Sequence, residues 1–320
     1  MSDAANAVFQ QTIIMFIIVI IGALCYKFRL INDEGKKQLS NFVLYVVNPL
    51  LIFMSYQTDM RSELIEGLIW TAIMAALTYT AFILISKLIF PDKADRKAVI
   101  ERFSVIYSNF GFMGTPLIFG VFGKDGVFIM NGFVTVSNLF IWTHGIITMS
   151  GKDTGRHTNI GKSLLMAIST PAVISVFSGL ICLFLGIKLP DIVAEAFNNV
   201  AEMTTPLAMT VAGASIMSAG ILGSLKNPRV YLISAVKLLL FPVIGFALIA
   251  FIPCPDMPKL VTLIEFSCPT AAIGTMFAIK FDRDPEYASQ LFAVSTLLSL
   301  VTLPLIAKAG TTLLEVIHSL

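Results

Sequence analysis

Apolar segments of about twenty residues follow one another along the whole of this 320-residue chain, separated by short polar loops. Hydrophobic residues make up 56% of the sequence and charged residues 13%, and the mean hydropathy is +0.85. A soluble domain carries about 25% charged residues, so this composition excludes one. Since a bilayer offers the backbone no hydrogen-bond partners, the segments are expected to be helices. The sequence predicts an all-α integral membrane protein.

Ten apolar segments are long enough to cross a bilayer, in two sets of five. The first set covers 7–26, 38–56, 66–85, 99–122 and 127–149, and the second covers 164–187, 192–217, 230–252, 259–279 and 287–307. The polar linker 150–163 divides the chain into a first repeat, 1–149, and a second repeat, 164–320. Lys27 and Arg29 follow the first segment instead of preceding it, so we expect a retained helix and not a secretory signal.

Basic residues are concentrated in the loops of one side. The loops after the first, third, fifth, seventh and ninth segments hold two or more each. The opposite loops hold only about one each, namely Arg61, Lys124, Lys188 and Lys259. The positive-inside rule therefore puts the linker in the cytoplasm and both termini outside, in a multi-pass protein of the cell membrane.

An internal repeat relates the two halves. Pro49-Leu50 returns as Pro206-Leu207 at a shift of 157 residues, and Gly114-Thr115 returns as Gly274-Thr275 at a shift of 160. A duplicated set of five spans inserts its second copy upside down. The pattern therefore predicts two inverted repeats of five helices, an architecture typical of alternating-access carriers.

Helix-breaking residues interrupt two of the predicted spans about ten residues in, which is roughly 15 Å and close to the bilayer midplane. The runs are S-N-F-G-F-M-G-T-P-L-I-F at 108–119 and F-S-C-P-T-A-A-I-G-T-M-F-A at 266–278. Gly111, Gly114 and Pro116 weaken helical bonding in the first, and Pro269 and Gly274 do so in the second. A single kink is more often packing than function, but a pair at matching depth indicates a substrate site.

Polar residues near these breaks supply the binding candidates. Asn131, Thr135 and Ser137 recur at helical spacing in the fifth span, where they either face the site or join neighbouring helices. The candidate substrate-binding residues are Asn109, Gly111, Gly114, Pro116, Asn131, Thr135, Pro269 and Thr270.

Ionisable residues within the predicted spans are costly and have to be explained. Glu265 stands one helical turn before Pro269, so either it has a coupling role or it is a structural carboxylate, protonated or held by hydroxyls. Glu202 is expected either to be buried or to lie near the outer interface. Lys237 is expected to extend towards the cytoplasm, and His144 to be a hydrogen-bonded core residue rather than a proton relay.

Four runs together resemble the auxin efflux carrier family, over nearly the whole chain. They are N-P-L-L-I-F at 48–53, N-F-G-F-M-G-T-P-L at 109–117, P-L-A-M-T-V-A-G-A-S at 206–215 and S-T-L-L-S-L-V-T-L-P at 295–304. The family includes plant auxin carriers and bacterial permeases for malate or malonate.

The resemblance implies the ten-helix fold of bile-acid/sodium symporters, with broken helices 4 and 9 crossing. Helices 1, 2, 6 and 7 would form a scaffold, and helices 3–5 and 8–10 a transport part. The short linker favours a bacterial-type member.

The resemblance also implies a cation site. In the bile-acid symporters a Ser-Asn pair on helix 4 and a Glu on helix 9 bind sodium, and Ser108, Asn109 and Glu265 resemble that set. Cys268 is the further candidate for cation coupling. Pro269 stands where those symporters carry a second amide, which argues against a second cation. Sodium, a proton at Glu265, or the membrane potential alone is expected to drive transport, and no other cofactor is expected.

The sequence therefore predicts a secondary transporter that moves a small organic anion, such as malate, malonate or an auxin-like acid, across the lipid bilayer. Helix N-termini at the breaks would attract the carboxylate. A bile-acid-type sodium symporter and a membrane-embedded receptor or enzyme are the alternatives. No H-E-x-x-H, G-x-S-x-G or nucleotide-binding G-x-x-x-x-G-K-[ST] motif supports catalysis, and the four cysteines have no C-x-x-C spacing. No nucleic-acid partner is expected, and two copies are expected to pair through the scaffold helices.

We predict that a cysteine introduced by Asp3→Cys reacts with a membrane-impermeant reagent in intact cells, whereas one introduced by Arg156→Cys reacts only after permeabilisation. The reason is the excess of basic residues on the linker side. Labelling of the position-156 variant alone in intact cells would show that the chain is inserted the other way round.

Overall fold

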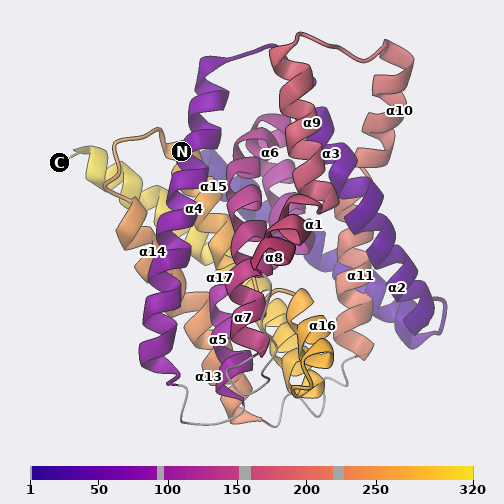
Figure 1. Ribbon diagram of the computed structural model, residues 1–320, viewed down its shortest axis with the longest axis vertical. Helices are drawn as coiled ribbons and strands as arrows, with labels where there is room; N and C mark the ends of the chain where they lie inside the picture. The colour runs from indigo at the N-terminus through magenta and orange to yellow at the C-terminus, as the bar shows by residue number, and fades with distance from the viewer. Residues whose placement is uncertain (1, 92–96, 151–159, 219–226, 320) are drawn as a thin grey trace.

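The computed structural model describes residues 2–91, 97–150, 160–218 and 227–319, and in these ranges the chain is built from helices (Figure 1). The first half contains α1 (Ser2–Lys27), α2 (Asp33–Phe42), α3 (Asn48–Ser55), α4 (Ser62–Ile89), α5 (Ala98–Ile106), α6 (Thr115–Phe140) and α7 (Ile146–Ser150). The second half contains α8 (Ile160–Ile168), α9 (Pro171–Phe184), α10 (Asp191–Ala201), α11 (Thr204–Ser218), α13 (Pro228–Ala235), α14 (Phe241–Ile249), α15 (Asp256–Ser267), α16 (Ile273–Lys280) and α17 (Pro285–Ser319).

Several of these helices are continuous with π-helical turns. The turn Val43–Val47 joins α2 to α3, Ile141–Gly145 joins α6 to α7, and Val236–Leu240 joins α13 to α14. A fourth turn, Phe110–Gly114, leads into α6. Turns of this kind are rare and are frequently found at functional sites.

Six helical stretches are long and apolar enough to cross a membrane. They are Ala7–Lys27, Asp33–Ser55, Ser62–Ile89, Phe110–Ser150, Pro228–Ile249 and Pro285–Ile317. The predicted spans 164–187, 192–217 and 259–279 instead consist of paired shorter helices, α8 with α9, α10 with α11, and α15 with α16. The all-helical, multi-pass character is confirmed, while ten crossings in inverted repeats remain a prediction. The central part of the predicted linker, 151–159, lies outside the described residues.

The predicted loop between the fourth and fifth spans falls inside α6. Gly123 has a φ of 61° and a ψ of −153°, so the helix is interrupted there although it continues on both sides. A left-handed φ is readily adopted only by glycine, which explains the residue at this position. The boundary expected between Phe122 and Val127 therefore corresponds to a kink and not to an open loop.

Glycines allow two pairs of long helices to pack closely. A Cβ at Gly22 of α1 would overlap the carbonyl oxygen of Thr210 in α11, and one at Gly213 of α11 would overlap that of Val19. In the second pair, α4 and α6, Gly132 lies against Leu68, and Thr71 Oγ1 donates to the Ile129 carbonyl over 2.6 Å. Small residues of this kind let membrane helices approach until their backbones touch.

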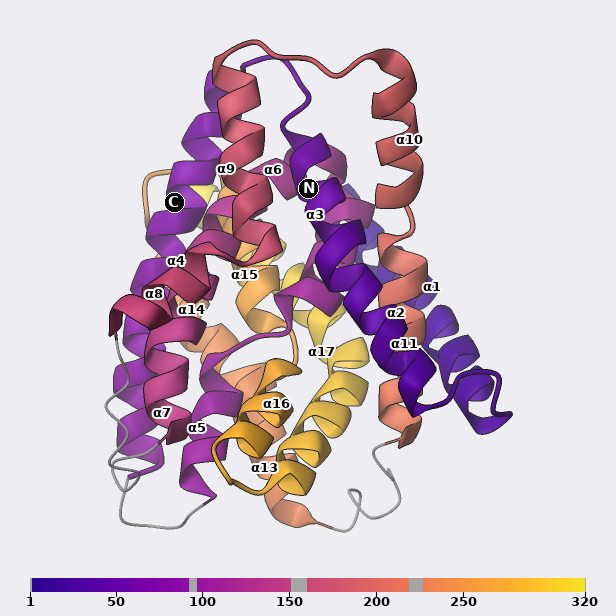
Figure 2. The same cartoon turned by 45° about the vertical axis from the view of Figure 1, so that its right-hand side comes forward.

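An ion pair with a buried carboxylate holds three helices together at one end. The Glu101 carboxylate of α5 is fully buried and accepts two bonds from Arg229 of α13, with Nη2 3.0 Å from Oε2. The Tyr287 hydroxyl of α17 donates to Oε1 over 2.7 Å. Figure 2 shows α15 and α16 following one another through the middle of the molecule, beside α17. These helices surround the candidate site.

We predict that Gly213→Leu destabilises the protein, because the added side chain would collide with the α1 backbone at Val19. Overpacking of this kind costs about 3 kcal/mol at a rigid site. Thermal unfolding in detergent should show a clearly lower midpoint. Gly186→Asn is the matched control, since Gly186 has open space around it and a φ of 67° that asparagine tolerates. An unchanged midpoint for Gly213→Leu would contradict the close α1–α11 contact.

Candidate substrate site

The two predicted breaks lie against each other in the interior. α5 ends at Ile106 and α15 at Ser267, and the chain between each helix and its continuation is extended. Ser108 stands opposite Thr270 in an antiparallel bridge. The Asn109 amide donates to the Pro269 carbonyl over 2.8 Å, and the Ala271 amide donates to the Tyr107 carbonyl over 3.0 Å. Each break thus supplies hydrogen-bond partners for backbone groups that the other break exposes. We call this region the crossing.

Proline and glycine act differently at the two breaks. Pro269 lies within the second break, and Cys268 before it is extended, as a residue before proline prefers. Pro116, by contrast, is the second residue of α6 and follows the π-helical turn Phe110–Gly114, so it removes one N–H donor from a continuous helical stretch. That Pro116 weakens helical bonding here stays a prediction. The break precedes Pro116 at Tyr107–Asn109, and Gly111 and Gly114 form part of the π-helical turn that follows.

Lys237 is a member of the crossing. Its side chain is fully buried, and Nζ donates to Ser108 Oγ over 2.7 Å and lies 3.3 Å from the Phe266 carbonyl oxygen. Ser108 Oγ donates in turn to the same carbonyl over 3.0 Å. The expectation that Lys237 extends to the cytoplasm was wrong, because its π-helical turn packs against α5, α15 and α17 and directs the side chain inwards.

Glu265 brings an acidic group to the same region. It is fully buried, and within the described ranges neither carboxylate oxygen has a hydrogen-bond partner. A Cβ at Gly114 would lie 2.5 Å from Oε1 and 2.6 Å from Oε2, so the absence of a side chain at position 114 makes room for the carboxylate. Glu265 therefore links α15 to the π-helical turn after the other break.

Two asparagines lie at the first break, Asn109 within it and Asn48 on α3. Asn109 is buried, and its Nδ2 is a donor without a partner among the described residues. Asn48 of α3 donates through Nδ2 to the Gly111 carbonyl over 2.8 Å, and its Oδ1 has no such partner. Asn48 was missed as a site residue by the sequence analysis. The sequence does contain a signal for it, since Asn48 is a polar side chain directly before Pro49 within an apolar segment.

The remaining candidates at the second break are held by structural hydrogen bonds. The Thr270 amide donates to Ser295 Oγ of α17 over 3.1 Å, and Thr270 Oγ1 donates to the Ser104 carbonyl over 3.2 Å. Cys268 Sγ donates to the Ile264 carbonyl at 3.3 Å. Both side chains are buried at the crossing. Their bonds fix the geometry of the break.

The candidates on α6 bond elsewhere. Asn131 Nδ2 donates to Ser55 Oγ of α3 over 3.3 Å, and Thr135 Oγ1 and Ser137 Oγ donate to carbonyls one turn earlier in α6. The structure thus gives Asn131 the interhelical contact that was one of its two expected roles. The Oδ1 atom of Asn131 is a buried acceptor that has no hydrogen-bond partner in the described part of the chain.

His144 and Glu202 were singled out by their charge. His144 Nδ1 lies 2.9 Å from the hydroxyl of Tyr107, the residue before Ser108, and that hydroxyl donates to the Phe140 carbonyl. His144 is therefore the hydrogen-bonded residue that was expected. Glu202 is exposed at the end of α10, which excludes the buried alternative.

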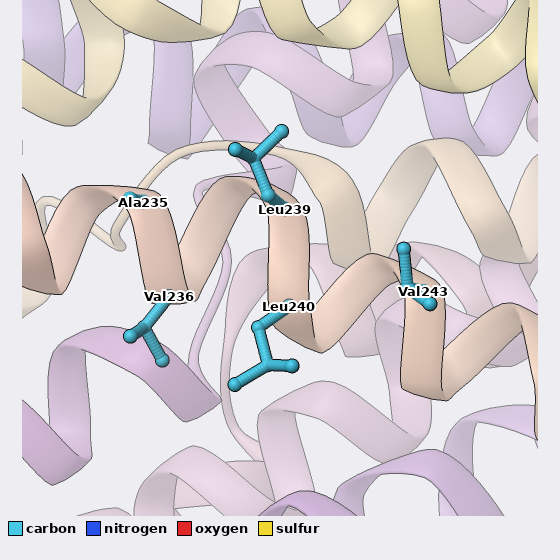
Figure 3. A pocket seen from close by; sticks show the side chains of 5 residues that line it. All are labelled: Ala235, Val236, Leu239, Leu240 and Val243. Atoms are coloured by element: carbon cyan, nitrogen blue, oxygen red, sulfur yellow. The ribbon is translucent and has the colours of Figure 1, made fainter.

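The hollow shown in Figure 3 lies on the exposed side of the helix whose buried side carries Lys237. It is lined by Ala235, Val236, Leu239, Leu240 and Val243, along α13, the π-helical turn and α14. All five side chains are aliphatic, and none can hydrogen bond to a carboxylate. The buried polar atoms that a small anion requires lie at the crossing instead.

Comparisons with known proteins identify the family of the chain. The family described as "Membrane transport protein" matches residues 7–307. One relative, an uncharacterized transporter of Methanocaldococcus jannaschii, is 26% identical over 310 residues, which cover 92% of this chain and 96% of the relative. Another, an uncharacterized transporter of Methanothermobacter thermautotrophicus, is 24% identical over 299 residues with the same two coverages. The chain therefore belongs to the membrane transport protein family, the auxin efflux carrier family that its motifs resemble.

Proposed function

We propose that the protein is a secondary transporter that moves a small organic anion, a mono- or dicarboxylate, by alternating access, with the crossing as its substrate site. The observation that carries this proposal is the pairing of two broken helices in the interior, at Ser108 and Thr270. Irregular backbone at membrane depth persists only where it is buried or lines a cavity. The family to which the chain belongs transports solutes across membranes.

The charge distribution at the crossing favours an anion. The π-helical turn Phe110–Gly114 and α16 begin directly after the two breaks, and the first amide groups of a helix carry partial positive charge. Asn109 adds a buried donor without a partner in the described residues, and Asn48 lies beside it at Gly111. Amide donors and helix N-termini together recognise a carboxylate.

Packing of the helices supports two moving parts. The predicted scaffold spans 1, 2, 6 and 7 correspond to α1, α2 with α3, α8 with α9, and α10 with α11. α1 packs extensively against α11, and α3 packs against both α9 and α10. The crossing is built from the other part, by α5, α6, α15, α16 and α17. We therefore propose ten spans in inverted repeats, with the scaffold also as the surface for a second copy, in the cell membrane with both termini outside.

Transport by purified protein in proteoliposomes tests the proposal. Uptake and counterflow of radiolabelled mono- and dicarboxylates should be saturable, and Asn109→Ala should lower the rate about tenfold, because it removes a buried donor. Pro269→Ala should lower it as well, by restoring helical bonding at the break. Asn198→Ala, at an exposed amide that accepts from Lys124, is the control. Unsaturable flux would indicate a channel, and full rates in both crossing variants would place the site elsewhere.

The coupling ion is proposed to be a proton at Glu265. A buried carboxylate without a partner is more stable as the neutral acid. Other titratable side chains buried around the crossing are Tyr79, Lys237 and Cys268. Glu265→Gln resembles the protonated form permanently, so it should abolish the pH dependence of net uptake while substrate exchange continues.

Two further outcomes of the Glu265→Gln measurement are informative. Loss of a stimulation by sodium, with the response to pH retained, would assign the residue to a sodium site with Ser108 and Asn109. Unchanged responses to both sodium and pH would exclude Glu265 from coupling and leave the membrane potential as the driving force for the anion.

A further inference from the structure

Lys237 lies near the middle of the candidate membrane span Pro228–Ile249, where a charged group is costly unless it is paired. Such a residue needs partners. Its two acceptors come from the two broken helices, Ser108 Oγ at 2.7 Å from the first and the Phe266 carbonyl oxygen at 3.3 Å from the second. The lysine thus connects three separate segments at one point.

Both acceptors stand at the C-terminal ends of helices. Phe266 belongs to the last turn of α15, whose final carbonyl groups have no partner within the helix. Ser108 follows the end of α5 at Ile106 by two residues. The C-terminal end of a helix carries partial negative charge and stabilises a cation, and the Phe266 carbonyl brings such an end, that of α15, to the nitrogen. The site therefore offers two oxygen acceptors to the amino group of the lysine.

We infer that the Lys237 ammonium is a tethered cation that occupies the position between the two broken helices where a coupling sodium ion would bind. A hydroxyl and a main-chain carbonyl are the hard oxygen ligands that such an ion requires. Lys237 uses both. The transporter then needs no sodium, and the ammonium supplies a positive charge at the crossing for its anionic substrate. The transport part of this inference rests on the proposed function.

The charge of Lys237 is not cancelled by the nearby acid. Within the described part of the chain, no ion pair within 4.0 Å joins Lys237 to Glu265, and both hydrogen-bond partners of the ammonium are neutral. Lys259 provides a contrast. It is also buried, but its Nζ donates to the Ala250 carbonyl, near the start of α15 and away from the breaks.

Thermal unfolding of the purified protein, in sodium chloride and in potassium chloride, tests the tethered cation without a substrate. The wild type should unfold at the same temperature in both salts. In potassium, Lys237→Ala should unfold at a lower temperature than the wild type, because Ser108 and Phe266 lose their donor. In sodium, part of this loss in the unfolding midpoint should be restored, because the ion can bind in the vacated space. Lys259→Met is the matched control, a buried lysine removed elsewhere, and should not respond to sodium.

Transport gives the second readout. Uptake by the wild type should be equal in sodium and in potassium. Lys237→Met should lower it about tenfold or more, whereas Lys237→Arg, which keeps the charge and the donors, should retain most of it. Lys259→Met should keep the wild-type independence of sodium.

Selective stabilisation of the wild type by sodium would overturn the inference even if every variant failed to fold. Full transport by Lys237→Met would overturn it too. If instead the wild type transports no carboxylate but the salt responses are as expected, the proposed substrate is wrong and the tethered cation stands.

Discussion

The structure depends on the main-chain pairing between two interrupted helices. An interrupted helix exposes amide and carbonyl groups, and in a membrane interior no water is available to bond them. Here the main-chain bridge between Ser108 and Thr270 lets each interrupted helix supply hydrogen-bond partners to the other. Because neither break is stable alone, α5, α15 and α16 have to meet, and α17 adds the Ser295 hydroxyl to the same point.

The charged residues of the interior follow from this pairing. At the crossing, the Phe266 carbonyl at the end of α15 bonds to Lys237, and the helices that continue from the breaks begin with amide groups. Glu265 fits because Gly114 has no side chain. A buried acid, a buried base and two asparagines with unused hydrogen-bonding groups are costly to the fold, so their presence together indicates function.

The features predicted best from the sequence were those with a direct backbone cause. Pro269, Gly111 and Gly114 marked where helices fail, and the structure brings those places together. Pro116 lies beyond the break itself, in the helical stretch that begins with the π-helical turn Phe110–Gly114. The burial of Lys237 could not be predicted, since apolar residues surround it on every side of its helix and periodicity does not show which face is turned inwards. Asn48 was missed because its acceptor, Gly111, is distant in sequence. The membership of the family was confirmed, while the number of crossings and their orientation are still predictions.

The buried carboxylate of Glu101 has a consequence for motion. It holds α5, α13 and α17 together at one end through Arg229 and Tyr287. These are the helices that carry or lead to Ser108, Lys237 and Ser295, so the three contributors to the crossing share one anchor. If one of these three helices moved along the membrane normal, the other two would move with it as a rigid body. The crossing would then move without changing its internal contacts. The surface along which it moves would have to lie between this unit and the neighbouring helices, not within it.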